Sequence, residues 1–157
     1  MITVASGLAL IAALSGFASP ADADDGDITA AAAAIRAVAP SVLADVSTAV
    51  VSGGDSDVLH SSSHGLLTTI PTDPADGIEL DRDGAPSITI GLPGAARADD
   101  AIELQRGVVA YDNNDGSTTV PVVKDDGSLQ VVTTITSRNA PQVFRYPLTL
   151  PTASQIA

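Results

Sequence analysis

The strongest fold signal in this chain is "YDNNDGSTTVPVVKDDGSLQV", residues 111–131. It has Asp-Gly pairs at 115–116 and 126–127, with a run rich in valine and threonine between them. Asp-Gly tolerates the positive φ that tight hairpin turns require, and β-branched residues favour strands. The stretch therefore predicts a β-meander, in which strands flank each Asp-Gly turn.

The same stretch also resembles a calcium-binding loop. An EF-hand-type loop needs Asp at position 1, Asp or Asn at 3 and 5, Gly at 6 and Glu at 12. With Asp112 at position 1, Asn114 fits position 3, but Gly116 occupies position 5 and Val123 position 12. The second turn, "KDDGS", has fewer ligands still. We therefore expect two turns here, with weak calcium binding as the alternative.

The same pattern of short strand-forming segments separated by turns extends over residues 66–157. Short segments rich in Val, Ile and Thr are bounded by Gly, Pro or Asp, and further Asp-Gly pairs occur at 76–77 and 83–84. This pattern predicts a mainly β domain, either an antiparallel sandwich or an open sheet. One helical turn is expected between Ala98 and Gln105. Strands are expected at residues 66–70, 78–80, 87–92, 107–111, 117–124, 128–136 and 142–150.

The last expected strand, 142–150, should have one buried face. Phe144 and Tyr146 are two residues apart, so they point to the same side of a strand, and Leu148 and Leu150 continue that side. Arg145 takes the opposite side. If this strand has no further neighbour, its open edge favours association.

Residues 1–23 have the pattern of a signal peptide, which we expect as an N-terminal signal helix. No charge precedes Asp22, a short apolar run ends at Phe17, and Ala21-Asp22-Ala23 is a small-x-small cleavage pattern. Cleavage after Ala23 predicts a secreted, extracellular protein. The alternative is an uncleaved anchor, because the uncharged run is about long enough to span a bilayer.

Residues 24–65 should form a short helical segment followed by a Ser/Gly linker, which leaves 66–157 as the β domain. Asp27 can cap a helix that begins at Ile28, and Pro40 should break that helix near Ala39. Residues 52–65 are small, polar and rich in breakers, which predicts a linker or an exposed loop. The helix has a weak apolar stripe at Ile28, Ile35 and Val42.

The expected linker contains both histidines, His60 and His64. On a helix, this spacing would place two imidazoles on one face for zinc, but the three serines between them are poor helix formers and no third ligand has helical spacing. A Ser-His-Asp site would need a strained elbow, and no G-x-S-x-G motif occurs. We therefore assign no catalytic, metal or cofactor residue, and we expect no cofactor.

Composition excludes several functions. The formal charge is −12, with 19 acidic and 7 basic residues. Such a surface repels nucleic acid and anionic membrane surfaces. The absence of cysteine excludes disulfides, thiolate catalysis and thiolate metal sites.

Two segments support a family resemblance. "SITIGLPGAARADDAIEL" (87–104) and "VVAYDNNDGSTTVPVVKDDGSLQVVTTITSRNAPQVFRYPLTLP" (108–151) resemble a group of uncharacterised secreted proteins of high-GC Gram-positive bacteria. The likeness covers about residues 68–151 and consists mainly of turn chemistry. It implies secretion but brings no activity. Because such proteins continue into further strands, the resemblance also implies a β domain truncated at its C-terminal end.

These observations predict a secreted, non-enzymatic structural or interaction protein of the cell envelope, with an envelope protein or polysaccharide as its partner. The alternative is a secreted hydrolase that uses the paired carboxylates Asp81 and Asp83, which would share a face of a strand. Asp-x-Asp-Gly is also typical of a turn. A deep pocket around one of these carboxyls would favour the enzyme, and a flat polar surface would favour the structural role.

Overall fold

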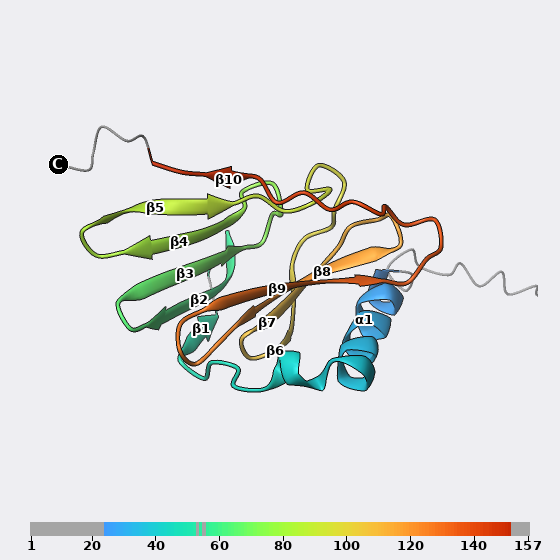
Figure 1. The fold of residues 1–157 in the computed structure, drawn as a ribbon, viewed down its shortest axis with the longest axis horizontal. Helices are drawn as coiled ribbons and strands as arrows, with labels where there is room; N and C mark the ends of the chain where they lie inside the picture. The colour runs from blue at the N-terminus through green and yellow to red at the C-terminus, as the bar shows by residue number, and fades with distance from the viewer. Residues whose placement is uncertain (1–23, 53, 55, 152–157) are drawn as a thin grey trace, which may run out of the picture.

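A computed structural model of the chain describes residues 24–52, 54 and 56–151. These residues form two antiparallel sheets and one α-helix, as Figure 1 shows. The expected mainly β fold class is therefore confirmed, with the short helical segment in front of the strands. The expected signal helix at 1–23 lies outside the described residues.

The larger sheet has six strands in the order β1-β2-β3-β4-β5-β10, and all neighbours pair antiparallel. Consecutive strands β1 to β5 are therefore spatial neighbours, as a meander requires. The strand bounds are β1 (Val50–Ser52), β2 (Asp57–Ser63), β3 (Leu66–Pro71), β4 (Ile78–Arg82), β5 (Ala85–Ile90) and β10 (Leu148–Thr149).

The smaller sheet is a four-stranded meander in the order β6-β7-β8-β9. Its central strands β7 and β8 are buried along their whole length. Pro121 lies within β8, and the described pairing of β7 with β8 has no pair at Val120 or at Pro121, which has no N–H to donate. The strand bounds are β6 (Ile102–Gln105), β7 (Val108–Asp112), β8 (Ser117–Val123) and β9 (Leu129–Ile135).

The two sheets pack face to face around an aliphatic core. Leu59, Ile70 and Ile78 of the larger sheet meet Val109 and Tyr111 of the smaller one. The Tyr111 hydroxyl donates a hydrogen bond of 2.5 Å to the carbonyl oxygen of Pro71, so the single aromatic ring of this cluster has a buried polar partner. This bond links the two sheets across the sandwich.

The opposite face of the smaller sheet is covered by helix α1 (Asp24–Val38) and the 3₁₀ turn η2 (Pro40–Leu43). The sequence-predicted stripe is confirmed, because Ile28, Ile35 and Val42 pack on this face. Among the described residues the helix covers Asp24–Val38, so it includes residues before the expected start at Ile28, and it ends before Pro40 as expected. Neither helix among the described residues is long and apolar enough to span a membrane.

The Asp-Gly turns are confirmed as sites of positive φ. Gly77, Gly84, Gly116 and Gly127 have φ values of 74°, 77°, 77° and 85°. Because these backbone conformations strain any residue with a Cβ, glycine fixes the position of each turn.

The expected linker over 52–65 is wrong for residues 57–63, which form the internal strand β2. Its serines are more typical of a linker than of a strand, but Ser61 is buried and its hydroxyl donates a hydrogen bond to the carbonyl oxygen of Ala49 at 3.2 Å. The β2–β3 turn is His64-Gly65, with φ values of 53° and 76°, as a two-residue hairpin turn requires.

Two further expectations are also wrong. The helical turn expected between Ala98 and Gln105 does not form, because residues 98–101 are irregular and Ile102–Gln105 is the edge strand β6. The strand expected at 142–150 is reduced to β10, which pairs with β5, because prolines at 141 and 147 interrupt backbone pairing. Leu148 and Leu150 are 60% and 63% exposed, so the expected continuous buried face does not form.

Candidate functional site

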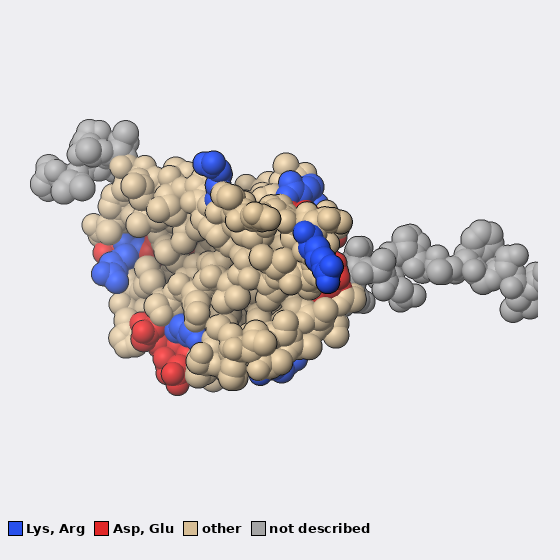
Figure 2. All heavy atoms as spheres, turned by 45° about the vertical axis from the view of Figure 1, so that its right-hand side comes forward, with Lys and Arg blue, Asp and Glu red and all other residues tan. Residues whose placement is uncertain are grey.

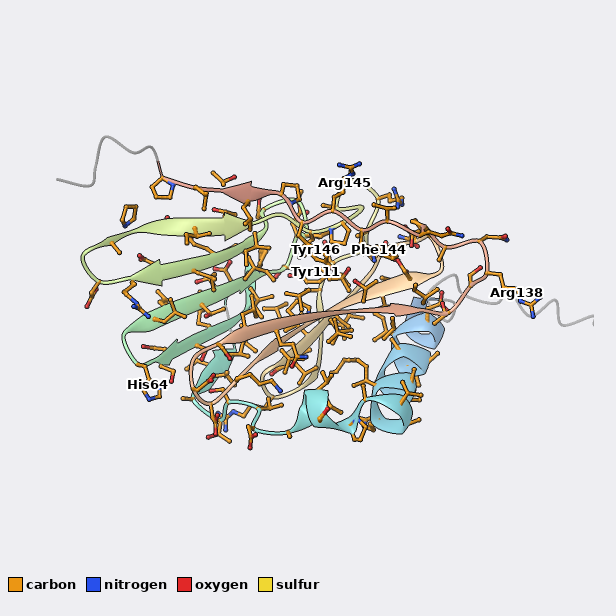
Figure 3. All side chains as sticks on the ribbon, viewed as in Figure 1. His64, Tyr111, Arg138, Phe144, Arg145 and Tyr146 are labelled. Carbon is orange, nitrogen blue, oxygen red and sulfur yellow. The ribbon has the colours of Figure 1, made fainter. Side chains whose placement is uncertain are left out.

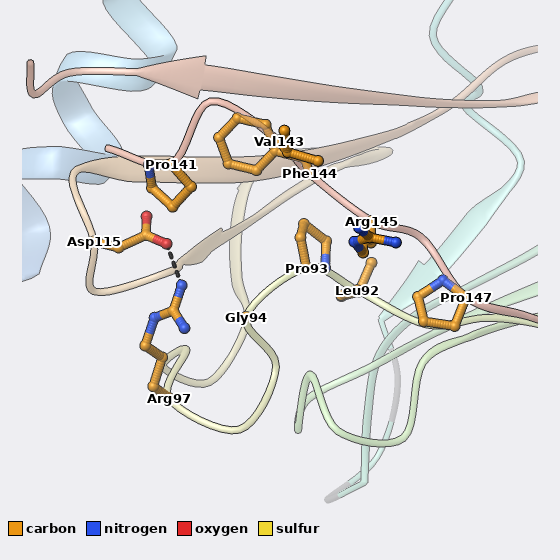
Figure 4. A pocket seen from close by; sticks show the side chains of 10 residues that line it. All are labelled: Leu92, Pro93, Gly94, Arg97, Asp115, Pro141, Val143, Phe144, Arg145 and Pro147. Carbon is orange, nitrogen blue, oxygen red and sulfur yellow. Dashed lines mark hydrogen bonds and ion pairs between the residues drawn. The ribbon is translucent and has the colours of Figure 1, made fainter. Parts of the chain in front are cut away.

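A hollow of about 330 Å³ lies where the loop after β5, the β7–β8 turn and the segment before β10 meet (Figure 4). These three segments are far apart in the sequence. The hollow is lined by Leu92, Pro93, Gly94, Arg97, Asp115, Pro141, Val143, Phe144, Arg145 and Pro147.

Hydrogen bonds fix the loop after β5 against the β7–β8 turn. The Arg97 guanidinium donates to the carbonyl oxygen of Asn113 at 3.2 Å and forms an ion pair with Asp115. In return, the Asn114 amide donates to the carbonyl oxygen of Arg97 at 2.8 Å. The two loops therefore form one wall with little freedom to move apart.

Asp115 is held ionised by its neighbours. Burial alone would raise the pKa of this carboxyl, but hydrogen bonds from Ser117 and Arg97, together with the Arg97 charge, outweigh burial and lower the pKa. The Ser117 hydroxyl donates at 2.5 Å and its backbone N–H at 3.1 Å. Asp115 is therefore a structural acceptor with its bonding capacity largely used.

The rest of the calcium-like stretch is turn chemistry. The Asp112 carboxylate accepts from the backbone N–H of Asn114 at 2.8 Å, and Asn114 has a φ of 53°. Asn113 is buried and donates to the hydroxyls of Ser117 and Thr119 at 2.9 and 3.0 Å. The described residues contain no group of three or more His, Asp or Glu that could hold a metal ion.

The opposite wall is the segment before β10. The backbone N–H of Gly91 donates to the carbonyl oxygen of Pro147 at 2.7 Å, and the hydroxyls of Tyr146 and Thr133 share a hydrogen bond of 2.6 Å. Figure 3 shows Phe144 and Tyr146 on the inner side of this segment and Arg145 on its outer side, the alternation that the sequence predicts.

Arg145 is exposed on the rim of the hollow. Within the part of the chain that the structure describes, it has no hydrogen bond and no ion pair, whereas Arg97 has both. On the face drawn in Figure 2, Lys and Arg side chains are scattered over a mostly uncharged surface. The hollow therefore has a mixed lining, in which prolines and other apolar side chains lie beside the Arg97–Asp115 ion pair, and one further cation, Arg145, has no ionic partner among the described residues.

The structure places the two histidines at separate positions. His60 lies in β2, where its ring is 3.2 Å from the Thr69 hydroxyl and 3.4 Å from the Asp57 carboxylate. His64 lies in the β2–β3 turn and contacts the Ser63 hydroxyl at 2.8 Å. Because this segment is a strand and a turn, the helical spacing that zinc chelation would need does not arise.

Asp81 and Asp83 do meet at one place, a hollow of about 230 Å³ that Ser62, Gly65 and Leu67 also line. Asp81 lies in β4 opposite Leu67, and Asp83 lies in the turn to β5. Both carboxylates are exposed. Catalysis by a carboxylate pair needs the two groups in different environments, usually one of them apolar, and this hollow does not separate them.

Sequence reasoning did not single out the hollow of Figure 4. A detectable signal was the concentration of prolines and glycines around Phe144 and at Leu92-Pro93-Gly94, which prevents regular pairing there.

Comparison with known proteins found no match to this chain among family models, curated proteins or solved structures.

Proposed function

We propose that this protein is a secreted, non-enzymatic interaction domain of the cell envelope, and that the hollow of Figure 4 is its binding site. One observation carries the proposal: a fixed, proline-lined hollow with both apolar and charged side chains has Arg145 on its rim, and this guanidinium has no ionic partner among the described residues. Ligand sites typically combine an apolar lining with a few well-placed polar groups.

The walls of the hollow are suited to binding because they are already ordered before a ligand binds. Proline fixes φ, and both walls are tied by the hydrogen bonds described above. A site that is already ordered loses less conformational entropy on binding.

The charges indicate the ligand class. A guanidinium binds a carboxylate through two parallel hydrogen bonds, and Arg145 is available for one whereas Arg97 is occupied by Asp115. The formal charge of −12 repels polyanions. The best fit is therefore a ligand with a single carboxylate beside an apolar body, such as the free C-terminus of a peptide on an envelope protein.

The lining favours binding over catalysis. It contains no Ser, His or Lys side chain, and its one carboxylate, Asp115, is occupied by Arg97 and Ser117. A nucleophile needs an adjacent base to activate it, and the lining supplies neither. The alternative hydrolase at Asp81 and Asp83 gains no support from the exposed position of both groups.

The proposal is tested with a short apolar peptide that ends in a free carboxylate and with the same peptide as its C-terminal amide. Titration calorimetry at physiological salt should find the free acid bound about 10- to 150-fold more tightly, since a hydrogen bond to a charged group contributes about 1.5–3 kcal/mol. Arg145→Gln should remove the difference. Arg138→Gln, at an exposed arginine outside the lining, should preserve it.

Two results would contradict the proposal. Equal binding of acid and amide, or an acid preference that survives in Arg145→Gln, would remove the assigned role of this guanidinium. Hydrolysis or other chemical conversion of either peptide by the protein would contradict the proposed non-enzymatic function.

A further inference from the structure

We propose that a second copy of this chain docks on the free edge of β9 and the adjoining groove beside α1, forming a symmetric dimer by strand addition. This interface lies apart from the hollow of Figure 4, since no β9 or α1 residue lines that hollow.

The first observation is the edge itself. β9 is the terminal strand of the smaller sheet, and among the described residues its backbone pairs only with β8. The other terminal strands β1, β6 and β10 have 3, 4 and 2 residues, whereas β9 has 7. Long edges usually contain a charge or a proline that prevents pairing, and β9, with the sequence LQVVTTI, has neither.

The second observation is an apolar groove of about 370 Å³ between the C-terminal half of α1 and β9. Figure 1 shows α1 lying beside the end of β9. Val38 and Ile135 border the groove and are 83% and 60% exposed, which leaves large apolar side chains uncovered. A strand added to the edge of β9 would lie beside Ile135, and the side chains on its helix-facing side would lie near Val38. The groove is lined by Ala34, Ile35, Val38, Ala39, Val132, Thr133, Thr134 and Ile135.

The third observation favours a second copy as the occupant, because β9 is complementary to itself. A two-fold axis at Val132 pairs Leu129 with Ile135, and all pairs join uncharged residues that suit a sheet. The axis keeps both copies of α1 on the same face of the continuous sheet. The remaining pairs are Val131 with Thr133 and Gln130 with Thr134.

Charge supports the same position. A chain with a formal charge of −12 repels its own copies, so self-association needs a contact surface without acidic groups. The groove lining and β9 together contain no charged residue.

Sedimentation equilibrium of the full chain over about 1 µM to about 1 mM tests the proposal. The mass should rise from 15.7 kDa toward twice that value. Val38→Lys and Ile135→Lys should each keep the chain monomeric, because each places a charge in the seam. Val51→Lys is the matched control, since Val51 is 69% exposed on β1, the edge strand of the other sheet, and this variant should still dimerise. Thermal melts establish that all three variants are folded.

A cross-link tests the register. The chain has no cysteine, so Val132→Cys adds a single thiol that meets its own copy at the two-fold axis. Directly opposed Cα atoms in a sheet are about 4.5–5.5 Å apart, within the range a disulfide can bridge. Mild oxidation should yield a covalent dimer for Val132→Cys, and much less for the more exposed Val51→Cys.

A chain that stays monomeric throughout the series overturns the proposal and would leave the edge to a strand of a different protein. An association that persists in both Val38→Lys and Ile135→Lys, or a faster cross-link at Val51→Cys, also overturns it by placing the contact elsewhere.

Discussion

Replacement of Gly116 by alanine should destabilise the fold through two separable effects. Gly116 has a φ of 77°, and an added Cβ would lie 2.2 Å from the Cβ of Ser137. The positive φ costs about 1–2 kcal/mol, partly offset by about 0.4–1 kcal/mol from the stiffer unfolded chain. The steric overlap adds about 1–3 kcal/mol, as overpacking does elsewhere. We expect a total loss of about 2–4 kcal/mol in the free energy of unfolding.

Gly84→Ala is the matched control, because Gly84 has the same φ of 77° in an Asp-Gly turn but nothing within 4 Å of the added Cβ. It should lose only about 1 kcal/mol. Combining Gly116→Ala with Ser137→Gly removes the clashing atom and leaves the Ser137 Cα as a contact at 3.4 Å. The double variant should therefore recover about 1–3 kcal/mol relative to additivity.

Urea denaturation followed by circular dichroism measures all of these free energies by linear extrapolation. Losses for Gly116→Ala and Gly84→Ala that agree within about 0.5 kcal/mol would refute the steric part of the reasoning. So would a Ser137→Gly change that restores nothing in the double variant.

Three further outcomes are expected. Burial, and then the charges of Asp57 and Asp73, raise the pKa of Tyr111, so the stability that its protonated hydroxyl contributes should be complete below about pH 10 and decrease as pH rises further. In a pH series of urea melts, Tyr111→Phe should remove this part of the loss of unfolding free energy at high pH. The net lowering of the Asp115 pKa should stabilise the fold above about pH 4 and be lost as pH falls through the folded-state pKa, so the stability difference from Asp115→Asn should shrink in acid. Calcium up to a few millimolar should leave the melting temperature unchanged, whereas a saturable rise abolished in Asp115→Ala would establish a calcium site.

The parts of the fold that local chemistry determines were predictable from the sequence. Each Asp-Gly pair marks a turn because glycine accepts positive φ. Ile28 and Ile35 recur at a helical spacing, and both are buried against the smaller sheet. The strands around Val120 follow from β-branched residues between those turns.

The errors arose where tertiary contacts outweigh local preference. Residues 57–63 have the composition of a linker, but hydrogen bonds to both neighbouring strands and from Ser61 to Ala49 make them an internal strand. Residues 142–147 have the composition of a strand, yet two prolines confine regular pairing to β10.

The candidate site was the least predictable part, since its walls come from three distant segments. The sequence predicts that Asp115 lies in a turn and that Arg145 faces outward. It gives no sign that Arg97 forms an ion pair with Asp115, or that Arg145 lies on the rim of the same hollow without an ionic partner among the described residues. Contacts between residues this far apart depend on how the two sheets pack.

The most direct test of the binding site is to map the free-carboxylate peptide onto the protein by the changes in backbone amide signals in heteronuclear NMR spectra. Changes should be confined to the segments that form the hollow, namely 92–97, 113–116 and 141–147, and should be weak or lacking with the amide form. Changes centred on Asp81 and Asp83, or a peptide that shifts no signal at the hollow, would contradict the assignment.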